Sequence, residues 1–461
     1  MTRIETGIQN LDTILHGGIP EGSTVLLAGR PGSGKTILAH QIMFHNAAPE
    51  SKALFLTTLS EPQVKVMHFQ QEFGFFDKAK FQNTVIYHDM GSIIRKRGAQ
   101  HAILIIDELL RKHQPRLVVI DTIKTISEMI PSLVEYREFL LDLSLRLTTW
   151  GCTTLLLGEY SEEDMNIRPE SAIADGIIYL NGVEEKRHQK RYLRILKMRG
   201  TNHISGENFF RITDQGIEVF PRLKPDLNDQ SYRQTSERIS TGLPQLDEMT
   251  AGGIPRGSTT LVSGASGTGK TLLALHFIYA GLLAGESVLF VTFEENPQQI
   301  LHGTSSMGLD LHAFINSDKL HFLYVSPMEL NVDEHIFDIQ NLAEECGVSR
   351  IVIDSISSFE LGMTDKVKYT DYIWAMTDYF KVQGINVLLT HEMHDSQQVT
   401  ELTKHGISFV ADNVILLRYL EQGFDIKRYL RVVKMRSSNH ANNLRELKIS
   451  SKGVRIGSSP S

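Results

Sequence analysis

The chain has 461 residues, of which 41% are hydrophobic and 22% charged, as in an ordinary globular protein rather than a disordered or fibrous one. Its net charge of −7 argues against a protein that coats nucleic acid by bulk electrostatic attraction. With only Cys152 and Cys346, a disulfide scaffold and a four-cysteine metal site are excluded. The N-terminal segment has no signal-peptide pattern, and no apolar run is long enough to span a bilayer, so we predict a cytoplasmic protein without membrane contact.

Short continuous apolar runs predict strands that are buried on both faces. In chain order these runs are 24–28, 54–57, 117–120 and 153–157, followed much later by 260–263, 288–292, 351–353 and 386–389. The spacing of apolar residues over 136–149 and 369–383 predicts helices between the strands. Strands that alternate with helices predict an α/β fold, in which a mainly parallel sheet is covered by helices. Ligands of such sheets bind beyond the carboxyl ends of the strands.

The two series of predicted elements belong to a long internal repeat. Residues 4–36 align with residues 239–271 at an offset of 235, and 18 of the 33 positions are identical. The segment LVVIDTI around Asp121 likewise matches IVIDSIS around Asp354. A repeat of this length indicates duplicated domains rather than a solenoid of small units. We predict two domains joined by a polar linker, with the boundaries 1–221, 222–237 and 238–461.

Both halves contain a glycine-rich motif of the form G-x-x-x-x-G-K-[ST], which follows a predicted strand and opens a predicted helix. Glycines let the backbone N–H groups face an anion, and the helix N-terminus adds partial positive charge. Lysine neutralises the β- and γ-phosphates. We therefore predict an ATP site in each half. The predicted binding residues are Gly29, Gly32, Ser33, Gly34, Lys35 and Thr36 in the first half and Gly264, Gly267, Thr268, Gly269, Lys270 and Thr271 in the second.

A Mg²⁺ ion is expected at both sites. The hydroxyls of Thr36 and Thr271 would ligate it. Asp121 and Asp354 end predicted strands about 85 residues after the P-loop lysines, where a carboxylate could hold the hydration shell of the ion. A single aspartate in this context would more often be a helix N-cap, but the pairing with a P-loop in both halves favours the metal role.

The halves differ after the second predicted strand. The second half reads FVTFEENP, with Glu294 and Glu295, where the first half reads FLTTLSEP, with Leu59 and Ser60. Adjacent carboxylates beside a γ-phosphate can orient or deprotonate the attacking water, whereas Leu59 and Ser60 cannot. Glu61 stands too far along the chain for a general base, unless the loop doubles back. We predict that Glu294, Glu295 and Lys270 carry most of the hydrolysis, the alternative being that both glutamates are solvated acids at a helix start.

A second repeated motif, K-M-R, lies near the end of each half. It occurs in ILKMRGTNH and again in VVKMRSSNH. Strand alternation places the lysine and the arginine of each copy on one face, so the pair could project cations toward a phosphate of a neighbouring subunit. A solvent-facing strand edge is the alternative. The residues predicted to act in trans are Lys197, Arg199, Lys434 and Arg436.

Together these motifs resemble the KaiC family of duplicated RecA-like ATPases, from about residue 4 to about residue 453. The resemblance rests on I-x-T-G-[IL]-x-x-L-D, G-G-I-P-x-G-S, both P-loops, F-V-T-F-E-E-N-P, I-D-S-I-S and K-M-R-[GS]-[TS]-N-H. It implies two tandem RecA-like P-loop domains and a homohexameric double ring with ATP at the subunit interfaces. Clock members phosphorylate themselves on an adjacent Ser-Thr pair. Here Ser408 keeps the hydroxyl, Phe409 replaces the threonine, and Thr403 is a weaker candidate acceptor.

The leading hypothesis is a ring ATPase that binds ATP and Mg²⁺ in both halves, hydrolyses ATP mainly in the second, and is a candidate serine/threonine autokinase in signalling. A signalling protein is a candidate partner. A DNA-dependent motor is the first alternative, although the acidic chain lacks the basic, aromatic-interleaved segment that single-strand binding needs. A nucleotide-gated scaffold with negligible turnover is the second.

Overall fold

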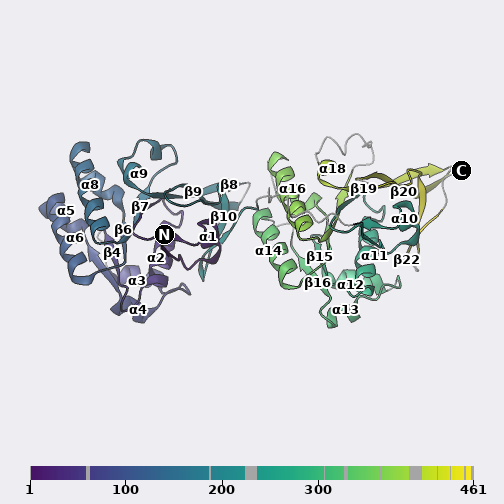
Figure 1. Cartoon of the computed structure of the whole chain (residues 1–461), viewed down its shortest axis with the longest axis horizontal. Coiled ribbons are helices and arrows are strands. Elements are labelled where there is room, and N and C mark those ends of the chain that lie inside the picture. The colour runs from purple at the N-terminus through teal and green to yellow at the C-terminus, as the bar shows by residue number, and fades with distance from the viewer. Residues whose placement is uncertain are drawn as a thin grey trace. The chain divides into compact units, whose positions relative to one another are not determined.

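The computed structural model consists of two compact units, Met1–Arg222 and Leu223–Ser461 (Figure 1). It describes residues 2–58, 63–185, 188–223, 236–305, 307–326, 331–362, 366–393, 407–422, 424–436, 438–450 and 453–457. The predicted linker therefore lies largely outside the described residues. Among the residues that are described, no helix is both long and apolar enough to cross a bilayer.

The first unit is built on a nine-stranded sheet with the order β11-β10-β9-β8-β3-β7-β6-β4-β5, in which β8, β3, β7, β6, β4 and β5 run parallel. Its strands are β3 (Thr24–Gly29), β4 (Ala53–Thr57), β5 (Val85–Asp89), β6 (Leu117–Asp121), β7 (Thr153–Glu159), β8 (Gly176–Glu185), β9 (His188–Met198), β10 (Asn208–Thr213) and β11 (Gly216–Phe220), with a separate short pair, β1 (Arg3–Ile4) and β2 (Ile19–Pro20). Its helices are α1 (Gln9–Ile14), α2 (Lys35–Asn46), α3 (Gln63–Gln70), α4 (Lys78–Asn83), α5 (Gly91–Arg97), α6 (Ala99–His113), α7 (Ile123–Met129), α8 (Leu133–Thr149) and α9 (Pro169–Ile173), with a 3₁₀ turn at Asp164–Asn166.

The second unit repeats this plan with the sheet order β16-β15-β17-β18-β14-β19-β20-β21-β22. Its strands are β14 (Thr259–Gly264), β15 (Val288–Thr292), β16 (Leu320–Tyr324), β17 (Arg350–Asp354), β18 (Asn386–Glu392), β19 (Asn413–Gln422), β20 (Asp425–Met435), β21 (Arg445–Ser450) and β22 (Gly453–Ile456), with the short pair β12 (Arg238–Ile239) and β13 (Ile254–Pro255). Its helices are α10 (Pro244–Met249), α11 (Lys270–Leu283), α12 (Pro297–Ser305), α13 (His312–Asn316), α14 (Val332–Glu345), α15 (Ser357–Gly362), α16 (Lys366–Val382) and α18 (Ile407–Val410).

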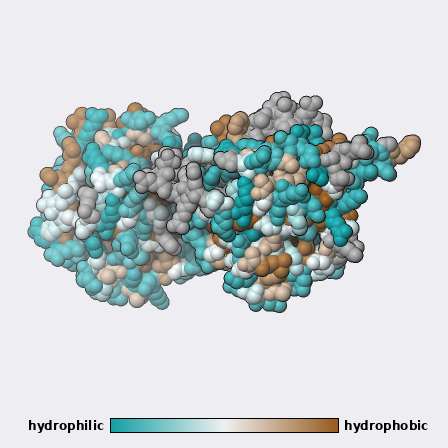
Figure 2. All heavy atoms as spheres, turned by 45° about the vertical axis from the view of Figure 1, so that its right-hand side comes forward, coloured by the Kyte–Doolittle hydropathy of each residue, from teal (hydrophilic) through white to brown (hydrophobic). Residues whose placement is uncertain are grey.

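Both faces of each parallel sheet are buried, as the continuous apolar runs predict. Along β3, Val25 and Leu27 pack into a core with α2, whereas Leu26 and Ala28 pack into a separate core with α6 and α8. This alternation is the period-2 pattern of a strand with helices on both sides. On the face shown in Figure 2 the surface is mainly hydrophilic, interrupted by scattered groups of apolar side chains.

The predicted fold class is confirmed: two tandem α/β units, each with a mainly parallel sheet flanked by helices. Each of the eight predicted strands lies within an observed strand. The predicted helices over 136–149 and 369–383 correspond to α8 and α16. The long strands β8 and β9, which pair with each other antiparallel, and their counterparts β19 and β20 are additions that the apolar runs do not reveal.

Candidate functional site

Each P-loop connects the central strand of its sheet to the helix that follows. In the first unit β3 ends at Gly29 and α2 begins at Lys35, and Gly34 before it has a φ of +100°. A Cβ on Gly29 would lie 2.2 Å from the carbonyl oxygen of Leu180, so only glycine fits there. Gly269 repeats the left-handed conformation with a φ of +105°. The sequence thus places a glycine-lined turn beyond the carboxyl end of the sheet.

The remaining loop residues line the same turn. Gly32 and Gly267 have φ values of +75° and +74°. Ser33 and Thr268 are buried, and the Thr268 hydroxyl donates to the carbonyl oxygen of Ala265 over 2.7 Å.

Both P-loop lysines are buried against their own loop. The Nζ of Lys35 donates to the carbonyl oxygens of Gly29, at 3.0 Å, and Arg30, at 2.9 Å. The Nζ of Lys270 donates to the equivalent oxygens of Gly264 and Ala265, both at 3.0 Å. Burial is the main cause that lowers the pKa of each lysine, and nearby carboxylates oppose it. A cation held at the mouth of an N–H-lined turn is suited to a phosphate.

The residues predicted to hold Mg²⁺ meet in the first unit. The Thr36 hydroxyl donates to Oδ2 of Asp121 over 2.9 Å, although the two residues are 85 positions apart. A hydroxyl beside a carboxylate is an all-oxygen donor set, which fits Mg²⁺. In the second unit Asp354 ends β17 at the position equivalent to Asp121 and accepts a hydrogen bond from the Thr390 hydroxyl. Thr271 follows Lys270 at the start of α11.

One further carboxylate stands beside each P-loop. Glu159 pairs with Gly29 across β7 and β3, and Glu392 pairs with Gly264 across β18 and β14. The two glutamates therefore occupy equivalent positions. Each acts electrostatically on the P-loop lysine of its own unit, where it opposes the effect of burial on the lysine pKa.

The charge around the two lysines differs. Glu294 acts on Lys270 together with Glu392 and Asp354. Partial desolvation, followed by the carboxylates of Asp354 and Glu392, raises the pKa of Glu294, so this carboxyl accepts a proton more readily than an ordinary glutamate does. Glu294 and the adjacent Glu295 are both exposed.

Lys35 in the first unit also has two neighbouring carboxylates, Glu159 and Asp121, but its third charged neighbour is a cation, Lys124, which lowers the pKa of Lys35. Lys124 was not identified in the sequence analysis. The signal was present in the alignment of the two halves, where Lys124 corresponds to Ser357. The positions Leu59, Ser60 and Glu61 lie outside the described residues.

The K-M-R motifs lie at the opposite end of each sheet from the P-loop. Lys197 donates to the carbonyl oxygens of Ser171 and Ala174, and Arg199 forms an ion pair with Asp175 at 3.2 Å. Asp175 in turn accepts a hydrogen bond from the N–H of Thr24, where β3 begins.

The second unit repeats this arrangement. Lys434 donates to the carbonyl oxygen of Ala411, and Arg436 donates to that of Phe409 and lies 3.5 Å from Asp412. The motif is therefore fixed at the amino end of the central strand in both units.

The candidate phosphorylation sites are only partly covered by the structure. Ser408 belongs to the short helix α18. Lys434 and Arg436 of the K-M-R motif donate to carbonyl oxygens in and next to this helix. The side chain of Ser408 lies outside the described part of the chain. Thr403 also lies outside the described residues.

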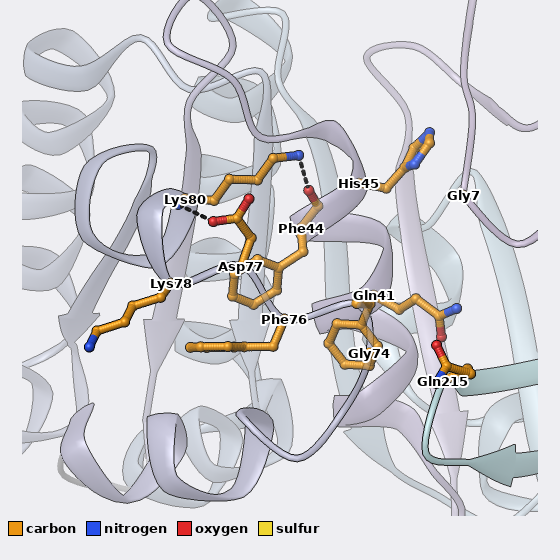
Figure 3. A pocket seen from close by; sticks show the side chains of 11 residues that line it. Gly7, Gln41, Phe44, His45, Gly74, Phe76, Asp77, Lys78, Lys80 and Gln215 are labelled. Atoms are coloured by element: carbon orange, nitrogen blue, oxygen red, sulfur yellow. Dashed lines mark hydrogen bonds between the residues drawn. The ribbon is translucent and has the colours of Figure 1, made fainter.

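The first unit contains a surface pocket of about 690 Å³ along the second half of α2 (Figure 3). Two of its polar side chains already have hydrogen-bond partners within the protein. Lys80 donates to the carbonyl oxygen of Phe44 over 2.7 Å, and Asp77 caps the N-terminus of α4. We assign no ligand to it.

Comparison with known proteins agrees with this architecture. The family model described as the KaiC ATPase matches residues 4–224 and again 239–461. The circadian clock oscillator protein KaiC of Picosynechococcus sp. is 30% identical over 98% of this chain and 89% of its own length. KaiC of Synechococcus elongatus is 29% identical over 99% of this chain and 89% of its own. The circadian clock protein KaiC3 of Synechocystis sp. is 29% identical, over 99% and 92% respectively. The chain belongs to the KaiC family of ATPases, with one family domain in each half.

Proposed function

We propose that the protein is a KaiC-type ATPase that binds ATP with Mg²⁺ in both halves and hydrolyses it mainly in the second. The observation that carries this proposal is the cluster around Lys270, in which Glu294 joins Asp354 and Glu392. Lys270 would neutralise phosphate charge, and Glu294 would orient the attacking water and accept its proton. Mg²⁺, when bound, neutralises charge on the phosphate oxygens; Thr36 with Asp121, and Thr271 with Asp354, would hold it.

The first half has a different electrostatic setting. Lys124 adds a second cation near Lys35, and the sequence offers Leu59 and Ser60 where the second half has its glutamates. Added positive charge favours retention of a triphosphate, but neither leucine nor serine can take a proton from water. We therefore infer that the first half binds ATP and turns it over slowly.

The position of the K-M-R cations supports shared sites between copies of the chain. β3 has six residues, so the motif at its amino end lies about 20 Å from the P-loop at its carboxyl end, at roughly 3.3 Å per residue. A lysine or arginine side chain cannot cover that distance within one unit. We infer that Lys197, Arg199, Lys434 and Arg436 serve the nucleotide of a neighbouring copy in a homohexameric ring.

Autophosphorylation at Ser408, with Thr403 as the weaker acceptor, extends the same proposal. α18 is attached to Lys434 and Arg436 through the carbonyl oxygens of Ala411 and Phe409. If those cations face a neighbour's γ-phosphate, the helix that carries Ser408 faces it too. A phosphorylated state of this helix would then be the signal that a partner protein recognises.

Incubation with γ-labelled ATP tests these activities together. Free phosphate is expected from the wild type. Label that stays on the protein and maps to Ser408 would support the autokinase activity, and its absence would exclude it. Release stimulated by single-stranded DNA would favour a DNA-dependent motor, and neither label nor free phosphate would favour a scaffold.

The double substitution Glu294→Gln with Glu295→Gln tests the assignment of hydrolysis. Phosphate release is expected to fall by about 100-fold or more, since a positioned general base contributes at least that factor. Glu248→Gln, which removes an exposed acid of α10, is the matched control and should leave release unchanged. Undiminished turnover in the double variant would refute the proposal.

A further inference from the structure

Beside the P-loop of the first unit lies a second, smaller cavity, between α2, α3 and the sheet. Its volume is about 220 Å³. One side is shared with the predicted metal site, and the others are formed by aromatic, aliphatic and polar side chains. The residues that line it are Thr36, His40, Phe55, Thr57, Val66, Phe69, Gln70 and Asp121.

Buried polar atoms around this cavity lack hydrogen-bond partners among the described residues. They are Nε2 of His40, Oε1 of Gln70 and, behind the wall, the hydroxyl of Tyr87. His40 is 0% and Gln70 6% exposed. The ring of His40 stacks on Phe55, at 4.7 Å between centroids, and on Tyr87, at 6.1 Å. A buried polar atom without a partner costs about 1–3 kcal/mol, so such a group normally binds something.

The hydrogen bond on the far side of the ring defines what His40 offers to the cavity. Its Nδ1 lies 2.7 Å from the carbonyl oxygen of Thr36, which has no proton to give, so Nδ1 carries the hydrogen. His40 is completely buried, which disfavours the charged form of the ring and keeps it neutral. In the neutral ring Nε2 is then an acceptor only. The Oε1 of Gln70 is a second acceptor.

The second unit shows that the fold does not need these polar groups. At an offset of 235, His40 corresponds to Leu275, Tyr87 to Phe322 and Gln70 to Ser305. The strand registers agree, because Phe55 pairs with Tyr87 as Phe290 pairs with Phe322. Leu275 is buried, and the Ser305 hydroxyl donates to the carbonyl oxygen of Leu301. The unpaired acceptors therefore belong to the first copy alone.

We propose that this cavity binds a small, uncharged planar molecule that donates a hydrogen bond, such as a phenol or an N–H azole. Its donor would bind Nε2 of His40, and its ring would pack against Phe55, Val66 and Phe69. The size fits, because a dry protein cavity of about 150 Å³ already holds benzene. The carboxylate of Asp121 on the rim disfavours an anion, and the metal expected there disfavours a cation.

Phenol and benzene are the probes that test this proposal, because they differ by one hydroxyl. Titration calorimetry on the full chain is expected to show one phenol bound per chain and benzene bound about tenfold more weakly. His40→Leu, which installs the residue of the second copy, should weaken phenol by about tenfold and leave benzene unchanged. His113→Leu, at the end of α6, is the matched control and should bind both as the wild type does.

The outcomes separate clearly. Equal binding of phenol and benzene by the wild type would overturn the proposal, as would equal phenol binding by the wild type and His40→Leu. No uptake of phenol at millimolar concentration would show that the cavity holds water only, and would overturn it as well. The comparison of the two probes in the wild type needs no variant to fold. Circular dichroism of His40→Leu checks that its loss of phenol binding is local.

Discussion

Each half has an arginine where the strand that ends in the predicted metal aspartate begins, but at different positions. Arg350 is the first residue of β17 and corresponds to Leu117, whereas Arg116 immediately precedes β6 and corresponds to Ser349. Only Arg350 is buried. Arg350 is 2% exposed, forms an ion pair with Glu286 and donates to the carbonyl oxygens of Ser240, at 2.8 Å, and Phe277, at 3.0 Å. Its guanidinium also lies over the ring of Phe277. Arg116 in the first half forms one ion pair with Glu21, and both side chains are substantially exposed to solvent.

We expect Arg350→Met to destabilise the second half by about 3 kcal/mol. The buried carbonyl group of Phe277 and the partly buried carbonyl group of Ser240 lose their donor, at about 1 kcal/mol each. The cation–π contact contributes about 1 kcal/mol more. In this variant Glu286 still has Arg256 as a cationic partner, at 3.4 Å, so the additional penalty of leaving a buried charge without a partner does not apply. Arg116→Met should cost about 1 kcal/mol or less, because exposed ion pairs contribute little.

Hydrogen exchange measured by mass spectrometry reports the local stability of each half separately. Peptides from β14 and β17 should exchange about 150-fold faster in Arg350→Met, since each 1.4 kcal/mol changes an opening equilibrium by about tenfold. Peptides from β3 and β6 should change by less than about tenfold in Arg116→Met. Equal effects in the two variants would refute the reasoning, because burial would then not determine how much an arginine at the start of this strand contributes to stability.

Two further perturbations have definite expectations. Gly29→Ala places a Cβ 2.2 Å from the carbonyl oxygen of Leu180, so it should displace the first P-loop. Calorimetry should then show one ATP bound per chain instead of two. Gly303→Ala, which has open space around the new Cβ, is the control and should still bind two. His40 has a folded-state pKa of about 4 against an ordinary value of 6.5, so the unfolded chain binds the proton first as pH falls. The first half should therefore lose up to about 3 kcal/mol of stability between pH 6.5 and pH 4, and calorimetric unfolding of His40→Leu should lack this loss; an identical pH dependence in both proteins would contradict it.

The sequence predicted the parallel part of each sheet well, because strands buried on both faces have to be apolar throughout. The K-M-R motif was expected on a strand, but the extent of β9 was not predicted, since the residues before the motif read HQKRYLRIL and do not form a continuous apolar run. Both P-loops could be predicted from the sequence. Their glycines are required by the backbone conformation of the loop and by close contact with neighbouring backbone atoms, and not by side-chain packing from elsewhere in the fold.

Other parts of the site depend on tertiary structure. That Lys124 acts on Lys35 depends on β6 being close to β3 in the sheet, although 89 positions separate the residues in sequence (124 − 35). The location of the K-M-R motif at the far end of β3 depends on β9 returning antiparallel to β8. Whether Nε2 of His40 has a hydrogen-bond partner depends on the side chains that surround it in the folded unit, which a single histidine in a predicted helix does not reveal.

The most direct test of the account is phosphate release by the matched variants Lys35→Ala and Lys270→Ala, each removing one P-loop cation. The account predicts that release survives in Lys35→Ala and is largely lost in Lys270→Ala. Release that is lost in Lys35→Ala and retained in Lys270→Ala would contradict it, because the first half would then carry the chemistry.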